Sequence, residues 1–318
     1  MAFSSIGPSA APALLMYQFI FSARLSRGGH DARREEMLSN WRQITHDGGM
    51  NRRNFLVRSS AMLAASSLHA DEATRLTDCH VYVGQHPFRQ LEDEQSFLKQ
   101  PVTEAWAGAF EGLLRRDVAE VNRQLALHCK TNATLRPCGT INLALPDWQD
   151  DVKRCVEVYG MRVLRLHPNY HGYTLEAPTF RDLLAFAVKH HVLIQIVDQM
   201  EDERTQHPQV RVAPVDLQPL SAIMKEIKAA RVMVLNANAA MVIKHLQDCP
   251  NVWLDFAMIE GVGGVENLLK IWPLDRLVFG SFAPVFYRDS ARLKMQESEL
   301  NESQMQAIRW RNSSTLLT

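Results

Sequence analysis

From about Thr74 onward, short apolar, β-branched runs alternate with longer segments in which apolar positions recur at three- and four-residue spacing. The short runs are typical of buried strands, and the longer segments of amphipathic helices that cover them. This alternation indicates repeated βα units around a parallel sheet. The predicted strands are Thr77–Val83, Thr103–Ala109, Thr134–Asn142, Arg162–Leu166, Val192–Val197, Arg231–Asn236, Val252–Phe256 and Arg276–Gly280. The predicted helices are Leu113–Cys129, Asp147–Tyr159, Thr179–His190, Leu217–Ala229, Ala239–Gln247, Val262–Ile271 and Glu302–Leu317.

Eight parallel strands with helices between them close most economically into a barrel. We therefore predict an α/β fold: a single, distorted (β/α)8 TIM-type barrel over residues 71–318. No repeat, low-complexity tract or linker in this part of the sequence suggests a second domain. In such barrels the catalytic groups lie where strands end and βα loops begin, so the residues at those places are the candidates for a site.

The segment before the barrel has a different character. Arg52 and Arg53 precede a modestly apolar run that ends near Ala70, and this order resembles a twin-arginine export signal. We predict a signal segment over residues 50–70 and a disordered upstream extension over residues 1–49. The protein is then expected to be periplasmic or otherwise exported if the signal is used, and cytoplasmic otherwise. An ordinary basic amphipathic helix is the alternative interpretation, and the run is too short and polar for stable membrane insertion.

The balance of charged residues does not indicate a macromolecular partner. Lys and Arg together number 35, as do Asp and Glu, so no net field favours nucleic acid or an anionic membrane. The five cysteines are scattered without a paired motif and are expected to be mostly buried thiols. We therefore expect a small-molecule substrate and no nucleic acid partner, and the sequence leaves a homo-oligomer open.

Polar residues mark several predicted strand ends. The first strand reads Asp78-Cys-His80-Val-Tyr82, the sixth ends at Asn236, and Gly280-Ser-Phe282-Ala-Pro284 follows the eighth. At these residues the chain resembles the amidohydrolase superfamily, in its amidohydrolase-related branch of metal-dependent hydrolases and decarboxylases, over about Leu76 to Leu317. That branch carries Asp-x-His-x-His on strand one, a His at the ends of strands five and six, and Gly-Ser/Thr-Asp-x-Pro after strand eight. The resemblance implies a metallo-dependent hydrolase-like barrel whose His and Asp residues hold one or two divalent ions, usually zinc.

This sequence departs from that pattern at four ligand positions. Tyr82 replaces the second His of strand one, Val197 or Asp198 the strand-five His, Asn236 the strand-six His, and Phe282 the Asp. Because zinc takes about four N, S or O ligands, these replacements argue against the standard ion cluster. We predict a hydrolase that acts on a small polar amide, ester or lactone. The alternatives are a carbon–carbon lyase (decarboxylase) of the same family and a noncatalytic barrel that binds a small molecule.

Two loops concentrate the remaining ionisable groups. His167 and His171 follow strand four, while Asp198, Asp202, Arg204 and His207 follow strand five. Together they either bind a displaced divalent metal such as zinc or form a metal-free acid/base site; singly, the histidines are also explained as turn elements that bond the backbone. The predicted catalytic residues are Asp202, His171 and Asp255, the substrate-binding residues are Arg89, His167, Tyr170, Arg204, Asn236 and Ser281, and the candidate metal ligands are His80 and His207.

Overall fold

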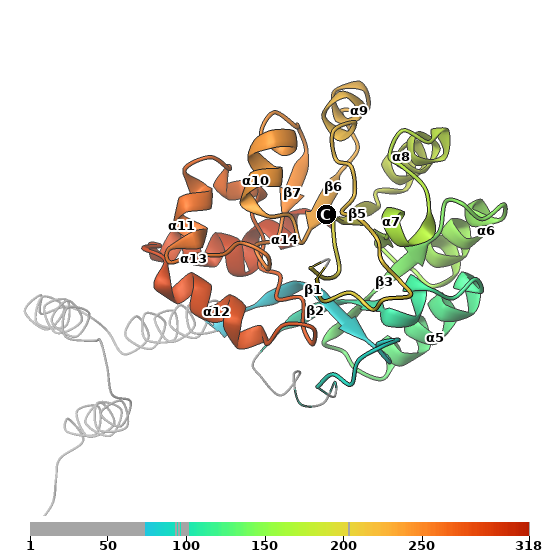
Figure 1. Cartoon of the computed structure of the whole chain (residues 1–318), viewed down its shortest axis with the longest axis horizontal. Helices are drawn as coiled ribbons and strands as arrows, with labels where there is room; N and C mark the ends of the chain where they lie inside the picture. Colours follow the sequence, from blue (N-terminus) through green and yellow to red (C-terminus); the bar gives the residue numbers. More distant parts are fainter. Residues whose placement is uncertain (1–73, 93, 95, 97–101, 203, 318) are drawn as a thin grey trace, which may run out of the picture. The chain divides into compact units, whose positions relative to one another are not determined.

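The computed structural model describes residues 74–92, 94, 96, 102–202 and 204–317. Seven parallel strands follow one another in sequence order around one sheet, and Figure 1 shows helices outside them. The strands are β1 (Thr77–Val83), β2 (Glu104–Ala109), β3 (Leu135–Ile141), β4 (Val163–Leu166), β5 (Leu193–Val197), β6 (Val232–Leu235) and β7 (Val252–Leu254). The predicted TIM-type barrel is confirmed, because each βα repeat adds one strand beside its predecessor.

The eighth predicted strand is an extended segment rather than a regular strand. Leu277 bridges Leu254 of β7, and Ala283 bridges Val81 of β1, both in parallel. The backbone N–H of Tyr82 donates to the carbonyl of Ala283 at 2.8 Å, so this segment joins the two edge strands and closes the barrel. Phe282 lies in the left-handed region with φ 59°, which interrupts the extended run and accounts for the missing regular ladder.

The helices follow the strands in the predicted order. They are α5 (Val118–Lys130), α6 (Trp148–Lys153), η3 (Arg154–Val158), α7 (Pro168–His171), α8 (Pro178–His190), α9 (Leu220–Glu226), α10 (Ala239–Met241), η4 (Val242–Leu246), α11 (Gly264–Leu269), α12 (Arg288–Glu297), α13 (Glu302–Gln306), η6 (Ala307–Arg311) and α14 (Asn312–Thr315). The predicted start of the first helix at Leu113 is wrong, because Asp117 caps α5 by accepting from the backbone N–H of Glu120. Helix α12 was absent from the prediction.

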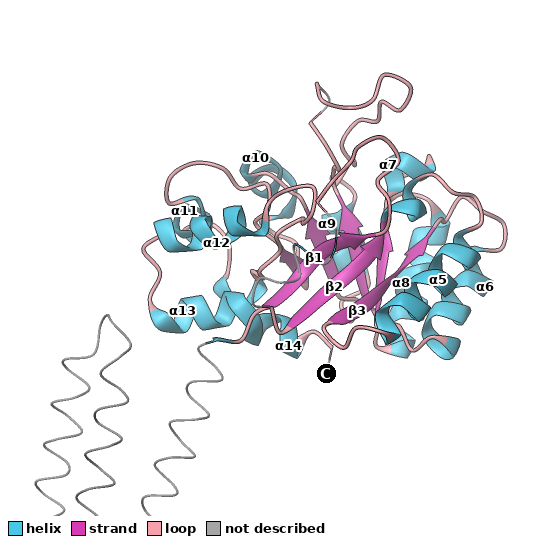
Figure 2. Ribbon diagram, turned by 90° about the horizontal axis from the view of Figure 1, so that it is seen from below, coloured by secondary structure: helices cyan, strands magenta, loops and turns pink. Residues whose placement is uncertain are grey.

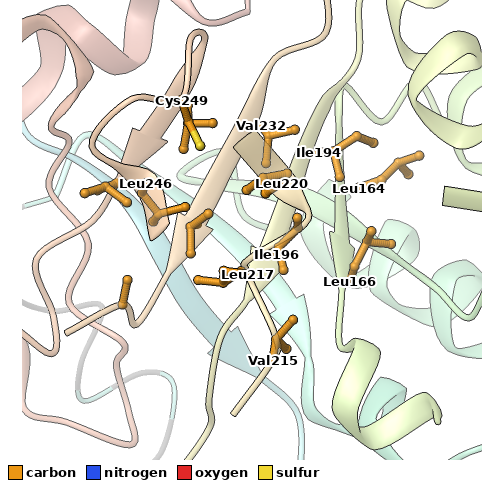
Figure 3. Close-up of a cluster of buried hydrophobic side chains, with 14 of the residues drawn as sticks. Leu164, Leu166, Ile194, Ile196, Val215, Leu217, Leu220, Val232, Leu246 and Cys249 are labelled. Atoms are coloured by element: carbon orange, nitrogen blue, oxygen red, sulfur yellow. The ribbon is translucent and has the colours of Figure 1, made fainter. Parts of the chain in front are cut away.

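Alternation along the strands divides the core into two layers. Residues such as Leu164 and Ile194 face the helices, and Figure 3 shows them packed with Leu217 and Leu220 of the segment that enters α9. The residues between them, such as Val163 and Leu193, fill the barrel interior. All five cysteines are buried and free, as predicted. The strands point toward the end that carries α7, opposite α14, as Figure 2 shows, so the site is expected at the α7 end.

The predicted signal segment at 50–70 and upstream extension at 1–49 lie outside the described residues. Within the part of the chain that the structure describes, no helix is long and apolar enough to cross a membrane.

Candidate functional site

A buried His–Asp pair lies at the centre of the barrel mouth. His80 Nδ1 donates to Asp255 Oδ2 at 2.6 Å, and both side chains have no exposed surface. Burial lowers the pKa of His80, although the hydrogen bond and charge of Asp255 oppose this shift. The imidazole is therefore neutral at neutral pH, and its Nε2, which has no hydrogen-bond partner among the described residues, carries a free lone pair.

Gly280 leaves room for this pair. A Cβ placed on Gly280 would lie 2.7 Å from Asp255 Cβ and 3.1 Å from His80 Cβ, closer than side chains approach one another. Asp255 also fixes the neighbouring strand end, because its Oδ1 accepts from the backbone N–H of Asn236 at 2.9 Å. The amide of Asn236 in turn donates to the carbonyl of Gln199. Asn236 therefore positions the loop after β5, while its Oδ1 remains buried without a partner in the described structure.

Aromatic rings enclose His80. The ring of Phe282 stacks on the imidazole with centroids 4.8 Å apart, and the edge of Tyr82 lies 5.6 Å away. Tyr82 itself stacks on Phe110 at 4.8 Å. All these side chains are buried, so the rings pack closely around the imidazole of the His80–Asp255 pair.

Tyr82 connects these rings to the first histidine loop. Its hydroxyl lies 2.8 Å from His167 Nε2, and the guanidinium of Arg165 lies over its ring at 4.8 Å. Arg165 is fully buried and donates to the side chain of Gln195 and to strand carbonyls that include Val81. Burial lowers the pKa of His167 well below its usual value, and the nearby histidine and arginine charges act in the same direction. His167 is therefore a neutral imidazole.

His171 lies beside His167 at the start of the loop after β4. The two ring centroids are 5.8 Å apart, and His171 Nε2 donates to the carbonyl of Gly112 at 2.9 Å. Burial lowers the pKa of His171, although backbone carbonyls oppose the shift. The structure thus brings His80, His167 and His171 together as a row of neutral rings joined through Tyr82.

Ser281 lies in a separate buried network. Its hydroxyl donates to Asp78 Oδ2 at 2.6 Å, and Arg288 Nε donates to the same oxygen at 2.9 Å. This ion pair ties β1 to the closing segment and to α12 with both side chains fully buried. The predicted substrate-binding role of Ser281 stays a prediction, since the contact the structure gives it is with Asp78.

Asp198 is a buried carboxyl at the end of β5. Its side chain has no exposed surface, and neither oxygen has a hydrogen-bond partner within the described chain. Burial raises the pKa of Asp198 to about 7, and the backbone N–H of Val215 opposes this shift only in part. Its backbone carbonyl accepts from Val215 N–H and from the amide of Asn169, so Asp198 lies at the base of the long loop after β5.

The outer loop residues meet around Glu201. Arg89 donates to its carboxylate at 2.5 Å, and His86 Nε2 lies 3.4 Å from the other oxygen. The ring of Phe88 stacks on His207 with centroids 4.4 Å apart. A small crevice between the loops after β1 and β5 is lined by His86, Pro87, Phe88, Leu113, Tyr170, Glu201, Gln206, His207 and Val210.

Two of the predicted site residues pair with each other at the surface. Arg204 donates to both oxygens of Asp202 and is 87% exposed, so this pair is solvated. The hydrogen bonds from Arg204 lower the pKa of Asp202 to about 2. Asp202 is therefore an anion at neutral pH, away from the buried rings, and the pair is not brought together with His171 or Asp255.

The donor set does not fit the implied metal. Among the described residues, no three His, Cys, Asp or Glu side chains are grouped so as to hold an ion. His80 Nδ1 is occupied by Asp255, while Phe282 places a phenyl ring against His80 where the family pattern supplies a carboxylate. His207 stacks on Phe88, and nothing brings it to His80. A divalent ion needs several N or O donors around one point. Beside the His80–Asp255 pair, the unpartnered donors among the described residues are His80 Nε2 and the amide oxygen of Asn236.

Sequence reasoning missed three residues that shape this site. Phe110 encloses Tyr82, Glu201 joins the outer loops, and Arg165 spans the interior of the barrel. Arg165 gave a usable signal, because an Arg inside the apolar run Val163–Leu166 must find buried partners. The sequence around Phe110 and Glu201 gave no such signal, because their partners Tyr82 and Arg89 belong to other segments of the chain.

Comparisons with known proteins agree with this architecture. The profile of the amidohydrolase family matches residues 90–317. Comparison with curated protein sequences finds no match. Three solved structures illustrate the fold. A 2,6-dihydroxybenzoate decarboxylase from Rhizobium is 12% identical, with a TM-score of 0.60 over 76% of this chain and 98% of that one.

The other two structures contain manganese. A dihydroxybenzoic acid decarboxylase from Polaromonas with bound manganese and 2-nitroresorcinol is 12% identical, with a TM-score of 0.58 over 76% of this chain and 96% of that one. A 5-carboxyvanillate decarboxylase from Novosphingobium aromaticivorans, complexed with manganese and 4-hydroxy-3-methoxy-5-nitrobenzoic acid, is 13% identical. Its TM-score is 0.56 over 71% of this chain and 79% of that one. At these identities the likeness shows the fold.

Proposed function

Because the chain belongs to the amidohydrolase family, we propose that it is a carbon–carbon lyase that decarboxylates a small aromatic acid, with the His80–Asp255 pair in place of a metal centre. The observation that carries the proposal is the Nε2 of a buried, Asp-oriented imidazole, which has no hydrogen-bond partner among the described residues and is packed among aromatic rings. Support for the reaction class comes from the neighbours of similar fold, three of which are named as decarboxylases of aromatic acids. The predicted hydrolase activity stays a prediction.

The aromatic side chains around His80 suit a ligand with an aromatic ring. Tyr82, Phe110 and Phe282 present ring faces and edges to one another at 4.8 to 5.9 Å, the range in which aromatic pairs attract. A flat substrate ring would have to displace one of these rings, and it would then supply the aromatic contact that the displaced ring gives up. The neutral imidazole lies within this stack, which places a nitrogen lone pair next to the bound ring.

The chemistry that His80 would supply is proton transfer. In decarboxylation the bond between ring carbon and carboxylate carbon breaks, its electron pair stays on the ring carbon, CO₂ leaves, and a proton takes its place. Neutral Nε2 accepts the proton of the substrate's carboxylic acid and then donates it to the ring carbon as CO₂ leaves. Asp255 stabilises the imidazolium between these two steps and orients the ring through Nδ1.

A second candidate is a noncatalytic barrel that binds the same class of small molecule. It is favoured by Phe282, whose fully buried ring covers the imidazole and closes the centre to solvent. Under this candidate an aromatic acid binds in the outer crevice beside Phe88 and Tyr170 and is released unchanged.

The test uses purified full-length protein and a panel of hydroxylated benzoic acids, with and without added Mn²⁺. Release of CO₂ and binding by calorimetry are measured for the parent chain, for His80→Gln and for Asp255→Asn. His128→Gln is the matched control, since His128 is a surface histidine on α5 that also pairs with a carboxylate, Glu94. We expect Mn²⁺-independent CO₂ release that falls by a factor of about 100 or more in His80→Gln and is unchanged in the control.

Each alternative outcome has a separate meaning. Saturable binding without CO₂ release supports the noncatalytic barrel. Turnover that requires Mn²⁺ refutes the metal-free site but keeps the lyase. Hydrolysis of esters, lactones or amides, screened in parallel, with no decarboxylation would restore the predicted hydrolase.

A further inference from the structure

Four buried polar atoms near the end of β3 and β4 have no hydrogen-bond partner among the described residues. They are Thr140 Oγ1, His167 Nδ1, His171 Nδ1 and the Tyr173 hydroxyl. In folded proteins such atoms are rarely left unsatisfied, because each costs about 1 to 3 kcal/mol. Four of them in one region indicate that another polar group is held there.

Contacts place these atoms together. The ring centroids of His167 and His171 are 5.8 Å apart, and those of His171 and Tyr173 are 6.4 Å apart. The hydroxyl of Thr140 lies against Gly112, where an added Cβ would approach it to 2.4 Å, and the carbonyl of Gly112 is the acceptor for His171. Thr140 therefore lies at the same wall of the barrel as the two histidines.

The two histidines are expected to be opposite tautomers. His171 Nε2 faces a carbonyl, so Nε2 carries the proton and Nδ1 is an acceptor. His167 Nε2 faces the hydroxyl of Tyr82, and a phenol is the stronger donor of the two, so Nε2 accepts and Nδ1 carries the proton. One free nitrogen is thus a donor and the other an acceptor, in two rings whose centroids lie 5.8 Å apart.

The protonation states of the two imidazoles indicate which kind of chemical group can bind between them. Burial lowers the pKa of both imidazoles, so both are neutral. Only His171 Nδ1 then has a free lone pair, and the described residues gather no three His, Cys, Asp or Glu side chains that could hold a metal ion. A carboxylate would place its oxygen against the lone pair of His171 Nδ1, which is repulsive. A neutral hydroxyl both accepts and donates, and so satisfies both nitrogens at once.

We propose that His167 and His171 form a binding site for one neutral hydroxyl group, filled by water in the free protein and by the hydroxyl of a phenolic ligand when one is bound. Thr140 supplies a further hydroxyl at its edge. This site lies beside Tyr82, one ring away from His80, and its existence does not depend on the reaction proposed above.

The test is nitrogen NMR on full-length protein labelled at histidine, which reports the protonated nitrogen of each ring directly. We expect the proton on Nδ1 for His167 and on Nε2 for His171, with both rings neutral at about pH 6, where an ordinary histidine is partly charged. His128, on the surface of α5, is the internal reference for a solvent-accessible imidazole. Signals are assigned with His167→Gln and His171→Gln, and a high-resolution crystal structure of the parent chain then shows whether an ordered oxygen contacts both nitrogens.

Titration with phenol separates the two sources of the hydroxyl. Saturable shifts at His167 and His171, absent at His128 and at least about fivefold weaker in Thr140→Val, support a ligand hydroxyl. No response to phenol together with an ordered water between the rings supports water as the occupant. The same tautomer in both rings, or a crystal structure without an atom bonded to both Nδ1 nitrogens, overturns the proposal. The parent-chain spectrum decides this even if a variant fails to fold.

Discussion

Replacing Asp198 with Asn should change how the stability of the barrel depends on pH. The carboxyl is fully buried and has no hydrogen-bond partner among the described residues, and burial raises its pKa from 3.8 to about 7. The folded state therefore binds this proton more tightly than the unfolded state does. Stability from this group is fully present below pH 3.8 and is lost as pH rises toward 7, because the unfolded state releases the proton first.

The magnitude follows from the shift. A difference of about 3 pH units corresponds to about 4 kcal/mol, since each unit is worth about 1.4 kcal/mol. Between about pH 4 and pH 8 the parent chain should lose about 3 to 4 kcal/mol that Asp198→Asn does not lose. The amide cannot ionise, and it leaves about the same volume filled. At low pH the variant should be equal to the parent or weaker by about 1 kcal/mol, because its NH₂ group also lacks a partner.

The assay is urea unfolding of parent and variant at several pH values, read as the difference between the two free energies of unfolding at each pH. Taking the difference cancels the titration of the other groups. Asp202→Asn is the control: its carboxylate is exposed, and Arg204 lowers its pKa to about 2, so its removal should leave the slope between pH 4 and pH 8 unchanged. Parallel profiles for parent and Asp198→Asn would refute the reasoning and show that the carboxyl has a partner in solution.

Three further changes test the contacts that hold the site. Asp78→Asn should lower the free energy of unfolding by about 3 to 5 kcal/mol in urea titrations, because it removes the buried carboxylate that pairs with the buried Arg288. A loss below 1 kcal/mol would contradict this. Gly280→Ala should lower the free energy of unfolding by about 1 to 3 kcal/mol and shift the His80 imidazole resonances, since the new Cβ would lie 2.7 Å from Asp255 Cβ. Unshifted His80 resonances would show that the added methyl group does not disturb the His80–Asp255 pair. Glu201→Gln should speed amide exchange at residues 86–89 and 204–212 severalfold, because the ion pair between Arg89 and Glu201 joins these two loops. Unchanged protection would mean that the stacking of Phe88 on His207 is enough to hold the loops together.

Local patterns in the sequence predicted most of the barrel. β1 begins and ends where its apolar run does, and period-two alternation correctly placed His80 and Tyr82 on one face, where their rings meet. The eighth strand was recognised by composition, yet its irregular form depends on the left-handed backbone of Phe282, which no propensity indicates for a phenylalanine.

The partners of the site residues were beyond local reasoning. His80 and Asp255 are 175 residues apart, and only closure of the barrel brings them to 2.6 Å. Asp202 and Arg204 were grouped with the histidines because they follow a strand, but in a long loop two nearby opposite charges pair with each other in solvent. Sequence spacing does not distinguish such a pair from one turned into the mouth.

Phe282 explains why the barrel centre is better suited to an acid/base pair than to an ion. A non-glycine residue held at φ 59° costs about 1 to 3 kcal/mol and is more readily tolerated by Asn or Asp than by Phe. Burying a phenyl ring contributes about 2 to 3 kcal/mol, so the contact with His80 offsets the backbone cost only while the ring stays in the stack. A substrate ring that displaced Phe282 would have to replace that contact on the same face of the imidazole. Under the proposed function, this residue, which stands where the family has a carboxylate, would favour a flat aromatic ligand bound against the His80 that Asp255 orients.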